Sequence, residues 1–351
     1  MKKHKRILRS ILGVALSASM LLSGCSLINI NHTDSSDSGS ESAVETTYEK
    51  TSGDTSETER RSADGISPML WKVTGSKGNT VYLFGTIHLG DERNDKVLDM
   101  LKGKLDECDE LAVEFDAVKF EDDAKNNPSS VMDIYRSIMY TDGTTVKDHL
   151  SSDLYKKCEA YLKGSGDFSE FLICYKAGMW ETMLSQAAVA KSPYSTDYAM
   201  DTKLINYFND NNKNVLDVES ADFQMKMIGD MSDELCELLI KSFFEQEAGY
   251  SDSIKNLYEA WLSGDENTIA QISSEDEDES GLTDKQIKLI EEYNKTMLDD
   301  RNKVMAEKAD IYIKEGKNIF FAVGAAHIVS GENSVIKLLE KKGYTIERIK
   351  I

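Results

Sequence analysis

Basic residues are scarce in this chain of 351 residues. It has 41 lysines and arginines against 62 aspartates and glutamates, and its net charge is −21. A surface of that charge repels the phosphates of nucleic acids and the headgroups of anionic lipids. We therefore expect no nucleic-acid partner and no direct binding to anionic headgroups.

Cysteine is also rare, and none of the five cysteines are spaced as Cys-x-x-Cys. This absence excludes a zinc ribbon and a thioredoxin-type redox motif. Cys108 and Cys174 lie in apolar stretches, which is typical of buried free thiols. The spacing of the four cysteines after Cys25 does not define any disulfide pairing.

The N-terminus lacks an apolar run long enough to form a stable transmembrane helix. Its apolar core, residues 11–22, is short, follows a basic segment and precedes Leu22-Ser23-Gly24-Cys25. This order predicts a signal peptide over residues 1–24, and its end resembles a bacterial lipobox. We expect Cys25 to be lipidated, because two or three acyl chains at about 0.8 kcal/mol per CH₂ hold a protein on a membrane. The predicted location is then the extracytoplasmic face of the bacterial cell membrane. An ordinary signal peptide with an incidental cysteine is the alternative.

The next segment has no tryptophan and no phenylalanine. Residues 26–65 contain fifteen serines and threonines and many acids. Such a composition buries too little apolar surface to offset the loss of chain entropy. We predict a disordered tether over residues 25–65 and a folded region over residues 66–351.

Hydrophobic patterning predicts two similar units at the ends of the folded region. In the first, a strand over 80–88 is followed by an amphipathic helix and a strand over 110–115. In the second, a strand over 318–323 precedes a helix near 332–342 and a strand over 344–350.

Between these units, residues 120–315 have mostly helical periodicity, with one short strand ending on Glu219 and an acidic loop over 273–280. The expected fold is α/β. It has a central mixed or parallel sheet built from two pseudo-repeated strand–Gly-x-x-His–helix–strand halves, and a large helical insertion.

Four predicted strands carry a polar residue at or near their carboxyl ends: His88, Glu114, Glu219 and His327. If the strands are parallel neighbours, these side chains meet at one edge of the sheet. Gly85 and Gly324 each precede a histidine by three positions and permit a sharp exit from the strand and a close approach. Each residue also has an ordinary structural interpretation: a hydrogen-bonded histidine, or a solvated glutamate on an edge strand.

Longer segments resemble the TraB/PrgY/GumN family. They are LWKVTGSKGNTVYLFGTIHLG at 70–90, CDELAVEFD at 108–116, YAMDTKLINYFNDNNKNVLDVES at 198–220 and DDRNKVMAEKADIYIKEGKNIFFAVGAAHIVSGENSVIKLLEKKGYTIERI at 299–349. That family is similar to the Tiki extracellular proteases and, more distantly, to the erythromycin-esterase and ChaN-like fold. Two residues depart from its pattern: Ala199 replaces the usual glycine, and Asp300 stands where a glutamate commonly precedes Arg-Asn.

The resemblance implies one pocket lined by His88, Glu114, Arg301 and His327, with Asp201, Glu219 and Asn302 nearby. Two imidazoles and a carboxylate are a ligand set for a divalent metal such as Mn, Co or Zn. Arg301 would hold a substrate carboxylate or stabilise an oxyanion.

The function implied is a metal-dependent peptidase that acts on peptides or protein termini outside the membrane. Two alternatives remain open. One is a metal-independent, esterase-like hydrolase with a histidine as general base. The other is a non-catalytic lipoprotein that sequesters a pheromone-like peptide.

Overall fold

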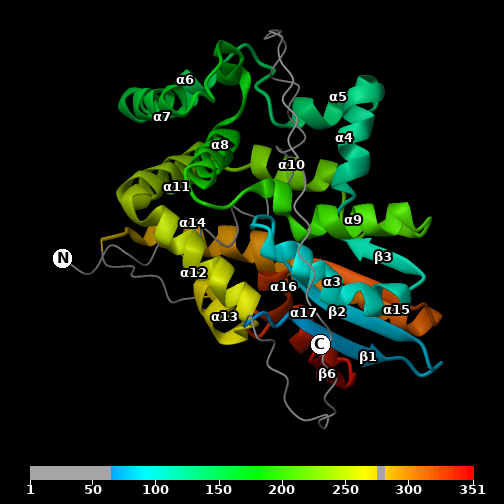
Figure 1. Ribbon diagram of the computed structural model, residues 1–351. Helices are drawn as coiled ribbons and strands as arrows, with labels where there is room; N and C mark the ends of the chain where they lie inside the picture. The colour runs from blue at the N-terminus through cyan, green and yellow to red at the C-terminus, as the bar shows by residue number, and fades with distance from the viewer. Residues whose placement is uncertain (1–64, 275–280) are drawn as a thin grey trace, which may run out of the picture.

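The computed structural model describes residues 65–274 and 281–351 (Figure 1). The predicted signal peptide, Cys25 and nearly all of the predicted tether lie outside these residues, as does most of the acidic loop. No helix in the described ranges is long and apolar enough to span a membrane.

Six strands form one mixed sheet in the order β4-β3-β5-β2-β1-β6. β4, β3, β5 and β2 run parallel to one another, whereas β1 is antiparallel to both of its neighbours, β2 and β6. The predicted mixed α/β fold is thereby confirmed. The strands are β1 (Leu70–Thr74), β2 (Thr80–Thr86), β3 (Glu110–Val113), β4 (Asn214–Asp217), β5 (Ile319–Gly324) and β6 (Ile346–Ile349).

Two features of the sheet go beyond the sequence-based expectation. β1 was not predicted; it pairs with β2 in a hairpin whose register sets Leu70 opposite Phe84. The two predicted units also interleave within the sheet, because β5 lies between β2 and β3. Every residue of β5 is buried, as expected for a central parallel strand with both faces covered.

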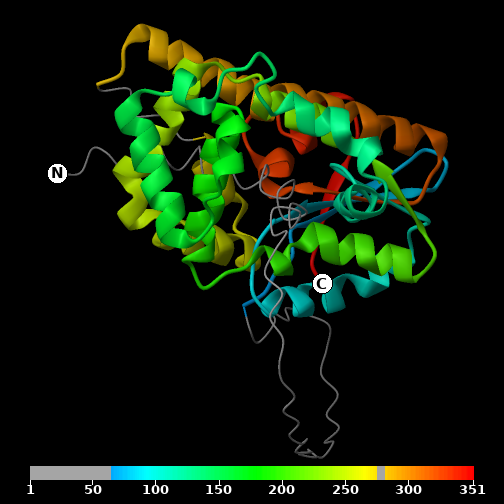
Figure 2. The same ribbon diagram turned by 90° about the horizontal axis from the view of Figure 1, so that it is seen from above.

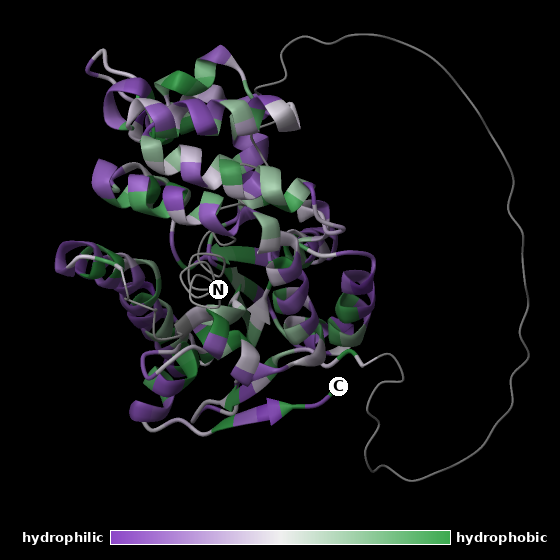
Figure 3. Ribbon diagram, turned by 90° about the vertical axis from the view of Figure 1, so that its left-hand side faces the viewer, coloured by the Kyte–Doolittle hydropathy of each residue, from purple (hydrophilic) through white to green (hydrophobic). Residues whose placement is uncertain are grey.

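Helices cover both faces of this sheet. α3 (Arg93–Asp106) and α9 (Met200–Asp210) lie on one face, and α15 (Arg301–Glu315) lies on the other (Figure 2). α17 (Val335–Lys341) packs against α15. α3 buries Val97, Leu101 and Leu105, the predicted stripe at helical spacing. In Figure 3 the central strands are green, and the helices mix green with purple.

The predicted helical insertion is confirmed and leads the chain from β3 to β5, with only β4 returning to the sheet. Its helices are α4 (Ala117–Asn126), α5 (Pro128–Ser137), α6 (Val146–His149), α7 (Ser152–Ser165), α8 (Ala177–Ala190), α9, α10 (Ala221–Gly229), α11 (Asp233–Gln246), α12 (Tyr250–Ser263), α13 (Glu266–Ser274), α14 (Asp284–Asn294) and α15. A π-helical turn, η5 (Lys295–Asp300), joins α14 to α15. After β5 the chain forms the short helix α16 (Ala325–Val329).

A glycine and the cysteines complete the description of the fold. Gly343 follows α17 with φ +93°, the left-handed conformation that favours glycine after a helix end. Cys108, Cys158, Cys174 and Cys236 are all free thiols. Cys108 is buried as predicted, but Cys174 is partly exposed, because it lies at the end of a short 3₁₀ turn.

Candidate functional site

The polar residues predicted at the strand ends do meet at one edge of the sheet. The parallel strands β2, β3, β4 and β5 all end there, and the chain carries His88, Glu114, Glu219 and His327 just beyond those ends. The ladder between β3 and β4 continues past the strands, since the Glu219 N–H donates to the Glu114 carbonyl over 2.8 Å. Both glutamates are therefore held side by side.

Gly324 marks the point at which three of these side chains converge. A Cβ atom on Gly324 would lie 3.2 Å from Glu114 Oε1, 3.6 Å from His327 Cδ2 and 3.8 Å from His88 Nε2. The Gly324 N–H donates to Glu114 Oε1 over 2.9 Å. A residue with a side chain would fill the space between the imidazoles and the carboxylate, so glycine keeps that space open.

Gly85, the glycine of the first Gly-x-x-His turn, serves packing instead. A Cβ atom there would lie 3.0 Å from the Cα of Ala325, in the second turn. The two turns therefore pack directly against each other, which brings together histidines 239 positions apart in the sequence.

His88 is oriented by a carboxylate. Its Nδ1 lies 2.7 Å from Asp201 Oδ2 and carries the proton, because an ionised carboxylate only accepts. Asp201, in the first turn of α9, also accepts from Thr86 Oγ1 over 2.7 Å. His88 Nε2 is buried and has no hydrogen-bond partner among the described residues. Burial opposes protonation of this imidazole, but the charge and hydrogen bond of Asp201 raise the pKa of His88 above its usual value.

His327 is oriented by an amide. It lies in α16, and its Nδ1 is 2.6 Å from Oδ1 of Asn302, in the first turn of α15. With Nδ1 as donor, the Nε2 lone pair faces Glu114, whose Oε1 lies 3.9 Å away. Burial and the nearby Arg301 cation lower the pKa of His327 to about 3, so this imidazole is neutral at physiological pH.

Arg301 joins the two buried glutamates. Its Nη2 donates to Glu114 Oε2 over 2.6 Å and to Glu219 Oε2 over 2.8 Å, and its Nε donates to Glu219 Oε1 over 2.9 Å. Its Nη1 donates to the Met297 carbonyl over 3.3 Å. Burial alone would raise the pKa of Glu114, but Arg301 lowers it to about 2, so Glu114 is ionised. The guanidinium is thus engaged on all three nitrogens.

Sequence reasoning missed two residues of this network. Gln224, in α10, donates its Nε2 to Glu114 Oε2 over 3.1 Å and to Glu219 Oε2 over 2.8 Å. Thr86 fixes the second oxygen of Asp201. Thr86 had a usable signal, because residues two apart at a strand end share a side. Gln224 belongs to no motif, and only the folded chain shows its position.

The donor atoms at this edge suit a divalent cation. His88 Nε2 and Glu114 Oε1 flank the Gly324 position, and His327 Nε2 lies 3.9 Å from Glu114 Oε1. Each Nδ1 has the outer hydrogen bond that is typical of metal-binding histidines. As placed, however, the described residues contain no group of three His, Cys, Asp or Glu side chains already gathered around one metal position. Glu114 is drawn toward Arg301 and Gln224 instead.

A family model for the TraB/PrgY/gumN family matches residues 69–348. The chain belongs to this family. The matched region begins at the residue before β1 and ends within β6, so it includes all the site residues described above. No curated protein and no solved structure matches the chain.

The two departures from the family pattern have different surroundings. Ala199 is buried and occupies the N-cap position of α9, two residues before Asp201, without a side-chain capping hydrogen bond. Asp300 is 44% exposed and pairs with Lys295 and Lys303 on the surface. A change at Asp300 therefore falls outside the cluster of buried site residues, whereas Ala199 lies next to a residue that orients His88.

Proposed function

We propose that this member of the TraB/PrgY/gumN family is a metal-dependent hydrolase that cleaves peptides or protein termini. One observation carries the proposal: the imidazoles of His88 and His327 converge on the ionised carboxylate of Glu114, while their Nδ1 atoms are held by other residues.

His88 and His327, with Glu114, are the residues that would hold the metal. The buried Nε2 of His88 supports this assignment, because a buried polar atom without a partner costs about 1–3 kcal/mol. Mn, Co and Zn are all compatible with this donor set. When bound, such a cation lowers the pKa of a water molecule and polarises a carbonyl group.

The other polar residues of the site orient these three side chains and set their protonation states. Asp201 and Asn302 fix the ring orientation and tautomer of the histidines. Arg301 and Gln224 hold Glu114 in place, and Arg301 keeps it ionised. We therefore assign Arg301 to positioning Glu114, in preference to the substrate-binding role that the sequence suggested, because all three of its nitrogens are already engaged.

The place of action follows from the sequence. The predicted signal peptide and lipidated Cys25 support a protein tethered to the membrane through its lipid, on the extracytoplasmic face. The peptide or protein substrate would meet it there. The net charge of −21 argues against a nucleic-acid partner, because a negative surface repels phosphates.

The His88–Asp201 pair favours a second candidate, a metal-independent hydrolase. A histidine bonded over 2.7 Å to a buried carboxylate is the arrangement that a general base needs. In this version Nε2 of His88 takes a proton from the attacking water, and Asp201 stabilises the imidazolium that forms.

Metal content and turnover, measured on the full-length protein, distinguish these candidates. Elemental analysis is combined with mass spectrometry of a peptide library incubated with the protein, with and without chelator. A metal-dependent hydrolase contains about one equivalent of metal and loses turnover when chelator is added. In His88→Ala and in His327→Ala, both the bound metal and the turnover should be lost. His149→Ala is the matched control, because His149 lies outside the site and bonds to Thr144 and Asp233.

The remaining outcomes distinguish the metal-independent hydrolase from peptide sequestration. Turnover that survives chelation but is lost in His88→Ala supports the metal-independent hydrolase. Binding of peptides with no product under any condition supports sequestration and rejects both hydrolases.

A further inference from the structure

A hollow beside the two imidazoles is mostly apolar. His88 and His327 form its polar end, and its walls include Leu257, Trp261, Ile269, Leu298 and Ala325. These wall residues come from four separate elements, α12, α13, η5 and α16, which meet beside the two imidazoles. None of the wall residues named carries a charge that would pair with a charged ligand group.

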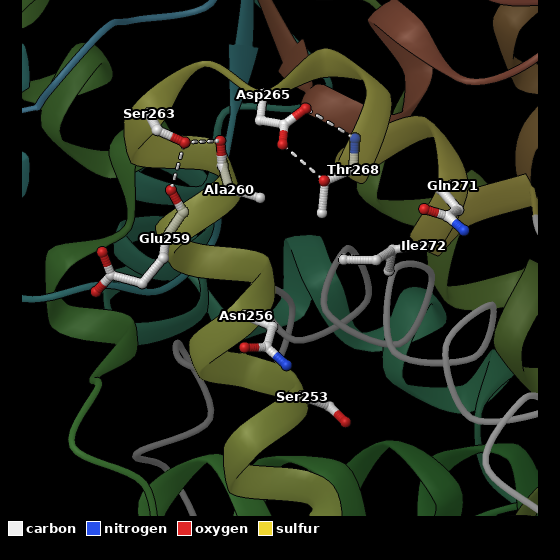
Figure 4. Close-up of a pocket in the computed structure, with 9 residues that line it drawn as sticks. All are labelled: Ser253, Asn256, Glu259, Ala260, Ser263, Asp265, Thr268, Gln271 and Ile272. Atoms are coloured by element: carbon white, nitrogen blue, oxygen red, sulfur yellow. Dashed lines mark hydrogen bonds between the residues drawn. The ribbon is translucent and has the colours of Figure 1, made fainter.

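α12 and α13 separate this hollow from a polar one. Leu257 and Trp261, one helical turn apart on α12, face the site. On α12, Ser253, Asn256 and Ser263 line the other hollow, whose residues are drawn in Figure 4. α12 therefore presents an apolar face to the imidazoles and a polar face to the second hollow.

Trp261 is the most firmly held of the residues that line the apolar hollow. Its Nε1 donates to the Gly85 carbonyl over 2.8 Å, so the turn that leads to His88 also anchors the indole. The ring packs edge-on against Phe84 and is stacked on Tyr258, with centroids 6.4 Å and 6.1 Å away. Only 1% of the residue is exposed. The spacing between this wall and His88 is thus set by the sheet itself.

The size of the hollow limits what it can hold. Its cavity volume is about 40 Å³, which accommodates about three water molecules on that scale. An apolar cavity of about 150 Å³ holds a benzene ring, so a hollow of this size is too small for an aromatic side chain and favours a small aliphatic one. A charged side chain would lose its hydration there and gain no counter-charge from the apolar walls.

We propose that this hollow binds one aliphatic side chain of the size of valine, leucine or isoleucine, next to the bond that is cleaved, and that Trp261 sets the size limit. The assignment rests on the proposed peptide hydrolysis, because it names the kind of residue that hydrolysis would select. The substrate class is then a peptide with a branched aliphatic residue at the cleavage position.

The test uses the full-length protein and pentapeptides Ala-Ala-X-Ala-Ala in which X is Ala, Leu, Phe, Asp or Lys. Cleavage at X is followed by mass spectrometry, and binding is measured by calorimetry on Glu114→Gln, which leaves the lining of the hollow unchanged. We expect the Leu peptide to exceed the Asp and Lys peptides by at least ~10-fold in kcat/KM and in affinity. Phe should also fall below Leu, because Trp261 limits the space.

Variants of the wall sharpen this test. Trp261→Ala should move the preference from Leu toward Phe, while Asn256→Ala, on the polar face of the same helix, should leave it unchanged. If Trp261→Ala does not fold, Leu298→Ala enlarges the hollow from a half-buried position and should produce the same shift.

The outcomes separate the two proposals. Leu-selective binding without cleavage supports the aliphatic pocket and rejects hydrolysis. Equal cleavage or binding of the Leu, Asp and Lys peptides, or no binding of any of them, overturns the pocket. An unchanged preference in both wall variants overturns the role of these walls.

Discussion

The two Gly-x-x-His turns place their imidazoles around one point by different local structures. In the first turn, Gly85 belongs to β2 and His88 follows in a loop. In the second, Gly324 ends β5 and His327 lies within the short helix α16. The shared spacing and the parallel pairing of β2 with β5 suffice to bring both rings to the same edge. Position at the site is therefore set by the strands.

The proton affinity of each ring is set by its hydrogen-bond partner and surroundings. His88 faces the carboxylate of Asp201, which raises its pKa despite burial. His327 faces the neutral amide of Asn302, and burial with Arg301 nearby lowers its pKa to about 3. Two similar motifs thus give one ring that protonates readily and one that stays neutral.

The largest expected effect comes from removing Arg301, the cation that pairs with both glutamates of the site. Arg301→Met leaves Glu114 and Glu219 buried side by side without a counter-charge, which should cost about 3–5 kcal/mol of unfolding free energy. Urea unfolding followed by circular dichroism measures this loss. Arg93→Met is the control, because the side chain of Arg93 is one-third exposed and its ion pairs should contribute less than about 1 kcal/mol. Equal losses in the two variants would contradict the central role of Arg301.

The two histidines should also give the unfolding free energy opposite pH dependences. His327 is neutral in the folded state down to pH of about 3 but protonates near 6.5 when unfolded, so its contribution to stability falls as pH drops below 6.5. The slope approaches about 1.4 kcal/mol per pH unit, on the order of 3 kcal/mol by pH 4. His88, with a raised pKa, stabilises the fold below 6.5 and loses that contribution as pH rises through its folded pKa.

Glutamine substitutions separate these contributions. In urea titrations between pH 7 and pH 4, His327→Gln should lose less stability on acidification than the wild-type protein, and His88→Gln should lose more. The same change in slope for both variants would show that the two rings are electrostatically equivalent.

Much of this site could be predicted from the sequence because its positions follow from strand periodicity. His88, Glu114, Glu219 and His327 lie just after apolar runs, and the carboxyl ends of parallel strands share an edge. The pairing of Asp201 with His88 and of Asn302 with His327 could not be read from spacing, since each joins helices and turns far apart in the chain. The family resemblance supplied those residues, and the structure supplied their partners.

The features that the sequence did not predict were missed for physical reasons. β1 precedes the turn between Gly75 and Asn79, and only this turn, which closes the hairpin with β2, makes the short segment before it a strand. The insertion of β5 between β2 and β3 depends on pairing across more than 200 residues, which local patterns do not encode. Gln224 bonds to a glutamate 110 positions away, from a helix with no distinguishing motif.

Alanine at the two glycines should separate packing from function. Gly85→Ala places a Cβ atom 3.0 Å from the Ala325 backbone, so it should destabilise the fold by about 1–3 kcal/mol. Gly324→Ala places its Cβ between Glu114 and the two imidazoles, 3.2 Å or more from their atoms, so it should cost less stability but abolish metal binding and turnover. Unfolding curves, metal content and peptide cleavage are compared for both. A Gly324→Ala variant with full activity would show that the space between the imidazoles is not used.

The smallest expected effects come from exchanging the partners of the two rings. Asp201→Asn gives His88 a neutral partner like that of His327, so the pKa of His88 should fall. The unfolding free energy should fall by about 1 kcal/mol, because a neutral hydrogen bond replaces a charge-assisted one. Asn302→Asp makes the reciprocal change, and the pKa of His327 should rise. NMR titration of the imidazole C–H signals measures both in the metal-free protein, with His149 as an internal reference far from either substitution. If the pKa of each ring stays unchanged, burial and Arg301, not the hydrogen-bond partner, determine the difference between the two turns.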